Sequence, residues 1–140
     1  MDNYKRLVDK IQADKNLKKV YKFMLSKIQI NPVGVLFAKD FTIGELSLYF
    51  NVSSNYAYGY LNMLESLKII SISIKTRKNI YSVDIENFIK LMVVQEDWKN
   101  PKQDFHDFKL NVIKLSDFDD GVKNDLFKRI NKETEVLNNA

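Results

Sequence analysis

Residues 52–70 read VSSNYAYGYLNMLESLKII, and this stretch decides how the chain folds. Ser53 or Ser54 can begin a helix there, because a serine hydroxyl accepts a hydrogen bond from an unpaired N–H of the first turn. Apolar residues then recur with helical spacing at Ala57, Tyr60, Leu61 and Leu64. The pattern predicts a helix over about residues 54–67, with one buried face and one exposed polar face.

A second capped helix precedes this one. Thr42-Ile43-Gly44-Glu45 fits a capping box, in which the Thr42 hydroxyl and the Glu45 carboxylate bond opposite backbone N–H groups. The helix is predicted to run through Phe50, with about three residues between it and the next helix. Two capped helices at this separation predict a helix-turn-helix.

The N-terminal region carries two more amphipathic runs. Residues 4–11 show helical spacing over a short stretch, and residues 17–28 repeat it more strongly, with Asp14 or Asn16 as the expected N-cap. Residues 31–34 read NPVG, a sequence that ends a helix because the proline disfavours helical backbone before it and the glycine permits a turn. The apolar residues 35–38 predict a short strand.

After residue 69 the apolar period changes from helical to alternating. Ile70, Ile72 and Ile74 are expected on one face of a strand. The polar residues 76–79 separate this strand from a second one over residues 80–83. The sequence therefore predicts a β-hairpin over about residues 70–83 with a basic tip.

The last third of the chain gives a weaker pattern. Helical spacing returns over residues 85–93, whereas alternation at Phe108, Leu110 and Val112 predicts a strand within residues 105–115. A final helix is expected to begin at Ser116 or Asp117. Its narrow apolar stripe is typical of a helix that packs on one neighbouring helix, and comprises Val122, Leu126, Ile130 and Leu137.

The order of helix, helix, helix and two-stranded hairpin resembles the winged helix-turn-helix superfamily of small bacterial, archaeal and archaeal-virus regulators. The resemblance rests on the Val52-Ser53 start, Ala57, the pair Tyr60-Leu61, the pair Leu64-Glu65 and the closing pair Ile69-Ile70. It implies a mainly α, α+β fold with a small β-hairpin wing. We expect an N-terminal helical extension over residues 1–13, the winged domain over residues 14–97, and a C-terminal extension with a terminal helix over residues 98–140.

The resemblance also implies a DNA-binding mode. In this superfamily the second helix of the motif enters the major groove, and the wing meets phosphates or the minor groove. Asparagine can bond bidentately to adenine, so AT-containing targets would suit the exposed face. The expected DNA-binding residues are Ser53, Ser54, Asn55, Tyr58, Asn62, Lys75, Arg77 and Lys78.

The sequence departs from the superfamily pattern in two places. Lys68 occupies the position where glycine commonly ends the recognition helix in a left-handed conformation, at some conformational cost. The exposed face of that helix also carries Asn, Tyr and Ser in place of the usual Arg or Lys. Phosphate attraction must then come mainly from the wing.

Charge is unevenly distributed along the chain. Residues 1–83 contain 13 Lys/Arg and 6 Asp/Glu, whereas residues 84–140 contain 9 and 12. A basic front half favours a polyanionic partner, and the acidic C-terminal segment is a candidate surface for a protein partner.

Several other classes of function lack their required residues. Cysteine is absent, which excludes disulfides, thiolate zinc sites and cysteine nucleophiles, and the single histidine, His106, cannot form an imidazole cluster. The four glycines are scattered and form no phosphate-binding loop. We therefore expect neither an enzyme nor a cofactor. No signal peptide or membrane span is recognisable, so a cytoplasmic location is expected.

These observations favour a sequence-specific double-stranded DNA-binding transcriptional regulator that acts as a homodimer, since two half-sites raise the affinity of a small domain. One alternative is a winged-helix adaptor whose tyrosine-rich helix binds protein, which would explain the missing cations on that helix. Another is an accessory DNA-binding protein of replication or partition.

Overall fold

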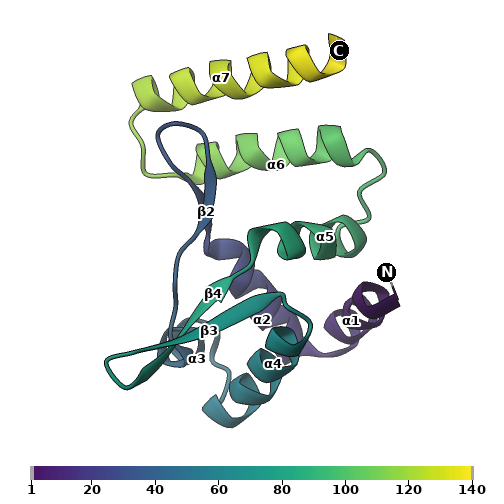
Figure 1. Ribbon diagram of the computed structural model, residues 1–140, viewed down its shortest axis with the longest axis vertical. Helices are drawn as coiled ribbons and strands as arrows, with labels where there is room; N and C mark the ends of the chain where they lie inside the picture. The colour runs from purple at the N-terminus through teal and green to yellow at the C-terminus, as the bar shows by residue number, and fades with distance from the viewer. Residues whose placement is uncertain (1, 140) are drawn as a thin grey trace. The chain divides into compact units, whose positions relative to one another are not determined.

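The computed structural model describes the backbone of residues 2–139 and the side chains of residues 4–133. It contains helices and two small antiparallel hairpins, as Figure 1 shows, and this confirms the predicted α+β winged-helix class. The elements in chain order are α1 (Asp2–Ala13), α2 (Lys15–Ser26), β1 (Ile28–Ile30), β2 (Leu36–Ala38), α3 (Ile43–Phe50), α4 (Ser54–Ser66), β3 (Ile70–Lys75), β4 (Lys78–Val83), α5 (Ile85–Gln95), α6 (Pro101–Leu115) and α7 (Asp120–Asn139).

The chain divides into two compact units. The first comprises Met1–Ile28 and Ala38–Asp97, and the second comprises Gln29–Phe37 and Trp98–Ala140. The first unit holds the helix-turn-helix and the β3–β4 wing. Helix α1 belongs to the same unit, because its residues Leu7 and Ile11 are buried there.

Capping side chains begin the helices of the first unit. The Asp14 carboxylate accepts hydrogen bonds from the N–H groups of Asn16 and Leu17, which identifies Asp14 as the cap of α2. The Thr42 hydroxyl accepts from the Glu45 N–H at the start of α3. The reciprocal half of the expected capping box is absent from this described region, since the Glu45 carboxylate pairs with Lys27 Nζ at 3.1 Å.

A group of buried aromatic rings positions the wing against α3. Phe41, just before α3, exchanges two 2.9 Å backbone hydrogen bonds with Tyr81 of β4. Their rings stack, and Phe23 of α2 meets Phe41 edge-on with ring centroids 5.0 Å apart. The wing is therefore fixed beside the start of α3 by both backbone pairing and packing.

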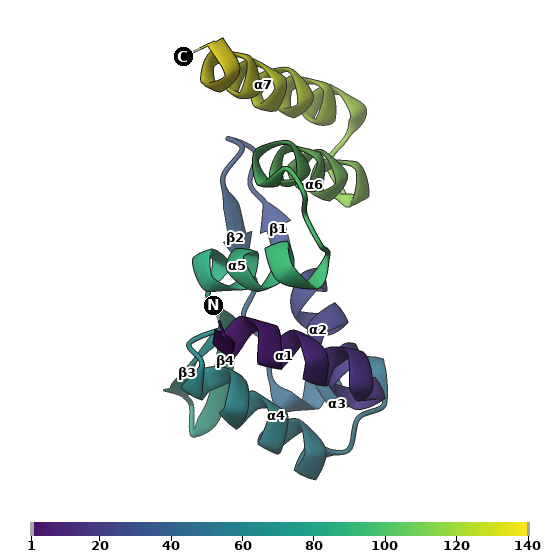
Figure 2. The same cartoon turned by 90° about the vertical axis from the view of Figure 1, so that its right-hand side faces the viewer.

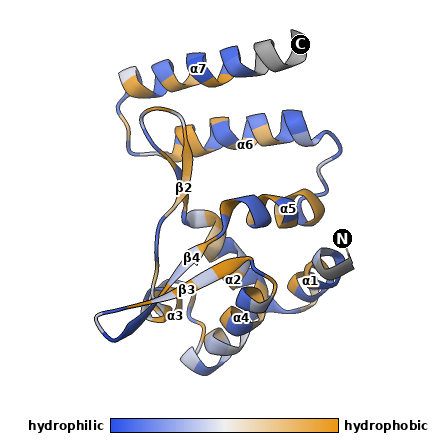
Figure 3. Ribbon diagram, in the orientation of Figure 1, coloured by the Kyte–Doolittle hydropathy of each residue, from blue (hydrophilic) through white to orange (hydrophobic). Residues whose placement is uncertain are grey.

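The wing has a buried base and an exposed tip. Ile70 and Val83 pair at the base and are almost fully buried, whereas Ile74 near the tip is 75% exposed. Ile70, Ile72 and Ile74 share one face of β3, as predicted, and this face becomes exposed toward the tip because the hairpin extends beyond the core that covers its base. The tip is hydrophilic in Figure 3.

The second unit contains α6 and α7, which pack on each other, and part of the β1–β2 hairpin, seen side-on in Figure 2. Its core consists of Ile30, Ile113, Leu126 and Ile130. Gly34 lies in the hairpin turn with a φ of 88°, where a Cβ would approach the Arg129 side chain to 3.3 Å. This supports both the turn expected at Gly34 and the helix packing expected for Leu126 and Ile130.

Three sequence predictions are wrong in detail around these elements. Residues 105–115 form helix rather than strand: Asn100 caps α6, Pro101 occupies its first turn, and the apolar residues also fit helical spacing. Ile28 lies in β1 rather than on α2. The last helix begins at Asp120, because Asp119 accepts a hydrogen bond from the Val122 N–H. The side chain of Leu137 lies outside the described residues.

Candidate nucleic-acid interface

A short turn sets the orientation of α4 relative to α3. Asn51 ends α3 in a left-handed conformation with a φ of 51°, and the buried Val52 anchors the turn. The Ser53 hydroxyl then accepts a hydrogen bond from the Tyr56 N–H and begins α4. Since this bond uses the Ser53 hydroxyl for capping, Ser53 has a structural role at the predicted site.

Helix α4 has one buried and one exposed face. Ala57, Leu61 and Leu64 are fully buried against the first unit. The exposed residues on the opposite side include Ser54, Asn55, Tyr58 and Asn62, all of them predicted site residues. Tyr56 is also exposed, although it was not among the predicted site residues.

Tyr60 lies at the edge of the buried face and bonds within the protein. Its hydroxyl donates a hydrogen bond to the Asp14 carboxylate, the side chain that also caps α2. Burial, and then this hydrogen bond, raise the pKa of Tyr60 to about 12. Of the three tyrosines at positions 56, 58 and 60, only 56 and 58 are therefore exposed for a partner.

The wing tip concentrates positive charge in a tight turn. The strand register places Lys75 directly opposite Lys78, with only Thr76 and Arg77 between them. Both turn residues have positive φ values, 53° and 63°, a conformation that non-glycine residues adopt at a cost. Lys75 Nζ lies 3.7 Å from an Asp40 carboxylate oxygen, and both side chains are largely exposed.

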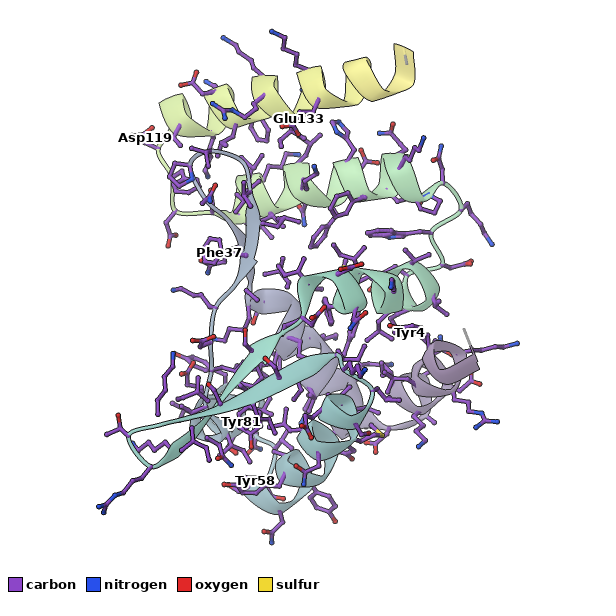
Figure 4. The ribbon with its side chains drawn as sticks, in the orientation of Figure 1. Tyr4, Phe37, Tyr58, Tyr81, Asp119 and Glu133 are labelled. Atoms are coloured by element: carbon purple, nitrogen blue, oxygen red, sulfur yellow. The ribbon has the colours of Figure 1, made fainter. Side chains whose placement is uncertain are left out.

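A hollow of about 410 Å³ joins the wing to both helices of the motif. Tyr58 of α4 lines it, and Figure 4 labels this residue below Tyr81 of the wing. The other lining residues are Thr42, Ile43 and Gly44 at the start of α3, and Arg77, Lys78 and Asn79 on the wing. Three predicted residues, Tyr58, Arg77 and Lys78, thus meet at one place.

The start of α3 was not predicted as part of the site. The capping motif at Thr42 indicated where this helix begins, but no local signal indicated that it would border the wing. That contact depends on the pairing of Phe41 with Tyr81, which are forty residues apart in sequence. An anion in the hollow would meet two cationic side chains and the positive end of a helix dipole.

Other chemistry finds little support in the described part of the chain. No group of three or more histidine, aspartate or glutamate side chains is close enough there to hold a metal ion. His106 is buried on α6 in the second unit. None of the described helices has the length and apolar character needed to cross a membrane.

The fold and this arrangement define a winged helix-turn-helix. The structure is similar to a solved structure titled as the type III plasmid segregation protein TubR, with a TM-score of 0.51 and 14% sequence identity. The match covers 68% of this chain and 86% of that one. No protein-family model matches the sequence, and no curated protein matches it significantly. At this identity, the likeness supports the fold alone.

Proposed function

We propose that this protein binds double-stranded DNA sequence-specifically as a transcriptional regulator, with α4 in the major groove and the wing on phosphates or in the minor groove. The observation that carries the proposal is the hollow that brings the polar face of α4 and the basic wing tip together. Base edges are read by short-range hydrogen bonds, whereas phosphates are held by cations, and the two parts of this surface match these two tasks.

The composition of α4 favours adenine and thymine in the target. Asn55 and Asn62 are exposed amides, and an amide can donate to adenine N7 and accept from its N6 amino group. No arginine stands on this helix to read guanine in the same bidentate way. The wing residues Lys75, Arg77 and Lys78 would supply the phosphate contacts that the helix lacks.

A role in plasmid segregation is a second candidate. It is favoured by the fold similarity to the plasmid segregation protein TubR. The two candidates share the same DNA-binding surface and differ in what the bound protein does. In either role we propose a homodimer, because paired half-sites strengthen binding by a small domain.

A fluorescence titration of labelled duplex DNA at two salt concentrations tests the proposal. We expect binding that weakens steeply with salt, and a site selected from random duplexes that binds more tightly than its scrambled form. Asn55→Ala and Asn62→Ala should each reduce that preference by about 1 to 3 kcal/mol and leave scrambled DNA nearly unaffected. Tyr58→Ala should act in the same way.

The adaptor alternative makes the opposite prediction. If micromolar protein binds no duplex at low salt, the exposed tyrosines of α4 face a protein partner and the DNA-binding proposal is wrong. Equal losses on selected and scrambled DNA in all three variants would mean that α4 only positions the backbone.

A further inference from the structure

A glycine lies in the middle of the exposed face of α4 without a structural reason inside the protein. Gly59 is the sixth residue of a 13-residue helix and does not have a positive φ. A Cβ added at Gly59 would meet nothing within 4 Å. Neither the backbone conformation nor the packing of this chain therefore requires glycine.

Glycine at such a position lowers stability. It leaves the unfolded chain more conformational freedom than alanine does, and it exposes the helix backbone to water. Alanine would fit the open space and strengthen the helix. The contrast with Gly34 is direct, since Gly34 has a positive φ and a close neighbour. The reason for Gly59 is thus to be sought in something that approaches α4 from outside.

The neighbours of Gly59 on the helix surface are residues three and four positions away. They include Asn55 and Tyr56 before it and Asn62 after it, all exposed. Gly59 therefore makes a gap between the two amides proposed to read adenine. Its backbone N–H and C=O groups are hydrogen-bonded within the helix, so the floor of this gap offers the Cα–H surface of the helix and no free N–H donor.

We propose that Gly59 is a specificity-determining position, whose missing side chain admits the C5-methyl group of a thymine to the backbone of α4. This inference rests on the DNA-binding function proposed above. A polar base edge pressed against the gap would lose its water without gaining a partner. The thymine methyl is the apolar group that a base pair presents in the major groove, and it loses nothing there.

The test combines a protein variant with a DNA variant. Gly59→Ala is compared with wild type on a selected site in which single thymines are replaced by deoxyuridine, which lacks only the methyl group. For wild type, one replacement should weaken binding about fourfold, which is the effect on affinity expected from burying one methyl-sized group. Gly59→Ala should bind the thymine site at least tenfold more weakly and lose this preference for thymine over deoxyuridine.

Stability and a matched glycine provide the controls. The melting temperature of free Gly59→Ala should rise, which shows that weaker binding does not come from damage to the fold. Gly121→Ala changes an exposed glycine in the first turn of α7 that belongs neither to the proposed DNA-binding surface nor to the apolar stripe of α7. This variant should leave DNA binding unchanged, since its added Cβ would approach only Asp119, at 3.4 Å.

The outcomes separate this inference from the function on which it rests. If Gly59→Ala binds the selected site as tightly as wild type, with the same deoxyuridine profile, Gly59 is not a specificity determinant although DNA binding stands. If it weakens selected and scrambled DNA equally, the gap admits the DNA backbone and the thymine assignment is overturned. If wild type binds no duplex, the proposed function itself fails.

Discussion

Lys68 illustrates how a single residue can depart from the pattern of its fold and still be accommodated. It links α4 to the wing with a φ of 62°, in the left-handed region that the resemblance to the winged helix-turn-helix pattern implied for this position. Asn87 of α5 donates a 2.9 Å hydrogen bond to its carbonyl oxygen and holds the turn. The conformation is therefore kept by the surrounding structure rather than by the preference of lysine.

Replacing Lys68 by glycine should stabilise the protein. Glycine adopts the left-handed region without steric cost, and this gain exceeds the extra freedom of the unfolded chain, so we expect the free energy of unfolding to rise by about 0.5 to 1 kcal/mol. Urea denaturation measures the change. Lys90→Gly, at an exposed position inside α5, should instead lower the free energy of unfolding by about 1 kcal/mol. A decrease for Lys68→Gly would contradict the prediction.

Leu64 tests which face of α4 is buried. Its side chain is fully buried, so Leu64→Ala should reduce the free energy of unfolding by about 2 to 5 kcal/mol through lost burial and a residual cavity. Leu48→Ala on α3 is the matched control, because Leu48 is 79% exposed and its loss should change stability by less than about 0.5 kcal/mol. A comparably small effect at Leu64 would mean that α4 is rotated about its axis.

At the scale of elements, one hydrogen bond ties α4 to the junction of α1 and α2. The Tyr60 hydroxyl donates to the Asp14 carboxylate, and this bond is the largest cause of the lowered pKa of Asp14. A lowered pKa in the folded state means that the unfolded chain binds the proton more tightly. The stabilisation is present above the ordinary pKa of an aspartate, 3.8, and is lost as pH falls through the folded value.

Tyr60→Phe should therefore lower the melting temperature at pH 7 and have a smaller effect as the pH falls toward 2, because protonation of Asp14 weakens the bond. At alkaline pH the stability of wild type falls with rising pH instead. The pKa of Tyr60 is raised from 10.0 to about 12, so wild type loses stability as pH rises through this window and the phenylalanine variant lacks that loss. Melting curves at pH 2, 7 and 11 measure these differences. Tyr56→Phe is the control, and a pH-independent effect of Tyr60→Phe would exclude the proposed bond.

The wing is the element expected to carry the salt dependence of binding. Arg77→Ala with Lys78→Ala should weaken binding to all duplexes about equally and flatten the slope of log affinity against log salt by about two, because each phosphate contact contributes about 0.9. Lys18→Ala with Lys22→Ala removes the same charge from exposed positions on α2 and should change the slope less. An unchanged slope in the wing variant would remove the wing from the interface.

At the scale of the whole molecule, the two units have separate cores. The first unit buries residues of α1 to α5, including Leu46, Leu61 and Phe88, whereas the second buries Leu126 and Ile130 of α7. A loss of α7 should therefore affect the second core first. This separation makes truncation a direct test of the domain boundaries predicted from the sequence.

Deleting residues 117–140 should leave a folded first unit and expose Ile113 on α6. Because α7 is also the candidate for contacts between copies, we expect light scattering to report less self-association than in the full chain. The unfolding transition of the first unit, followed by circular dichroism, should persist, whereas the fluorescence of Trp98 reports on the second unit. An unfolded truncation would show that the boundary was drawn wrongly, and undiminished self-association would place the contact elsewhere.

The sequence alone determined the features that depend on neighbours within one or two helical turns. The caps at Asp14, Thr42 and Ser53 and the buried face of α4 all follow from interactions between residues a few positions apart. Such interactions form within a short segment. The same local reasoning therefore identified the exposed polar residues of α4 and the basic residues of the wing.

Tertiary structure decided what the local pattern left ambiguous. The alternation at Phe108, Leu110 and Val112 fitted a strand, but the segment is a helix that packs against α7. Ile74 lies on the same strand face as the buried Ile70, but it is 75% exposed because the core covers only the base of the wing. The hollow exists because Phe41 pairs with Tyr81 far along the chain. Long-range contacts select one arrangement among several locally acceptable ones, and no short window of sequence contains the partner that makes the choice.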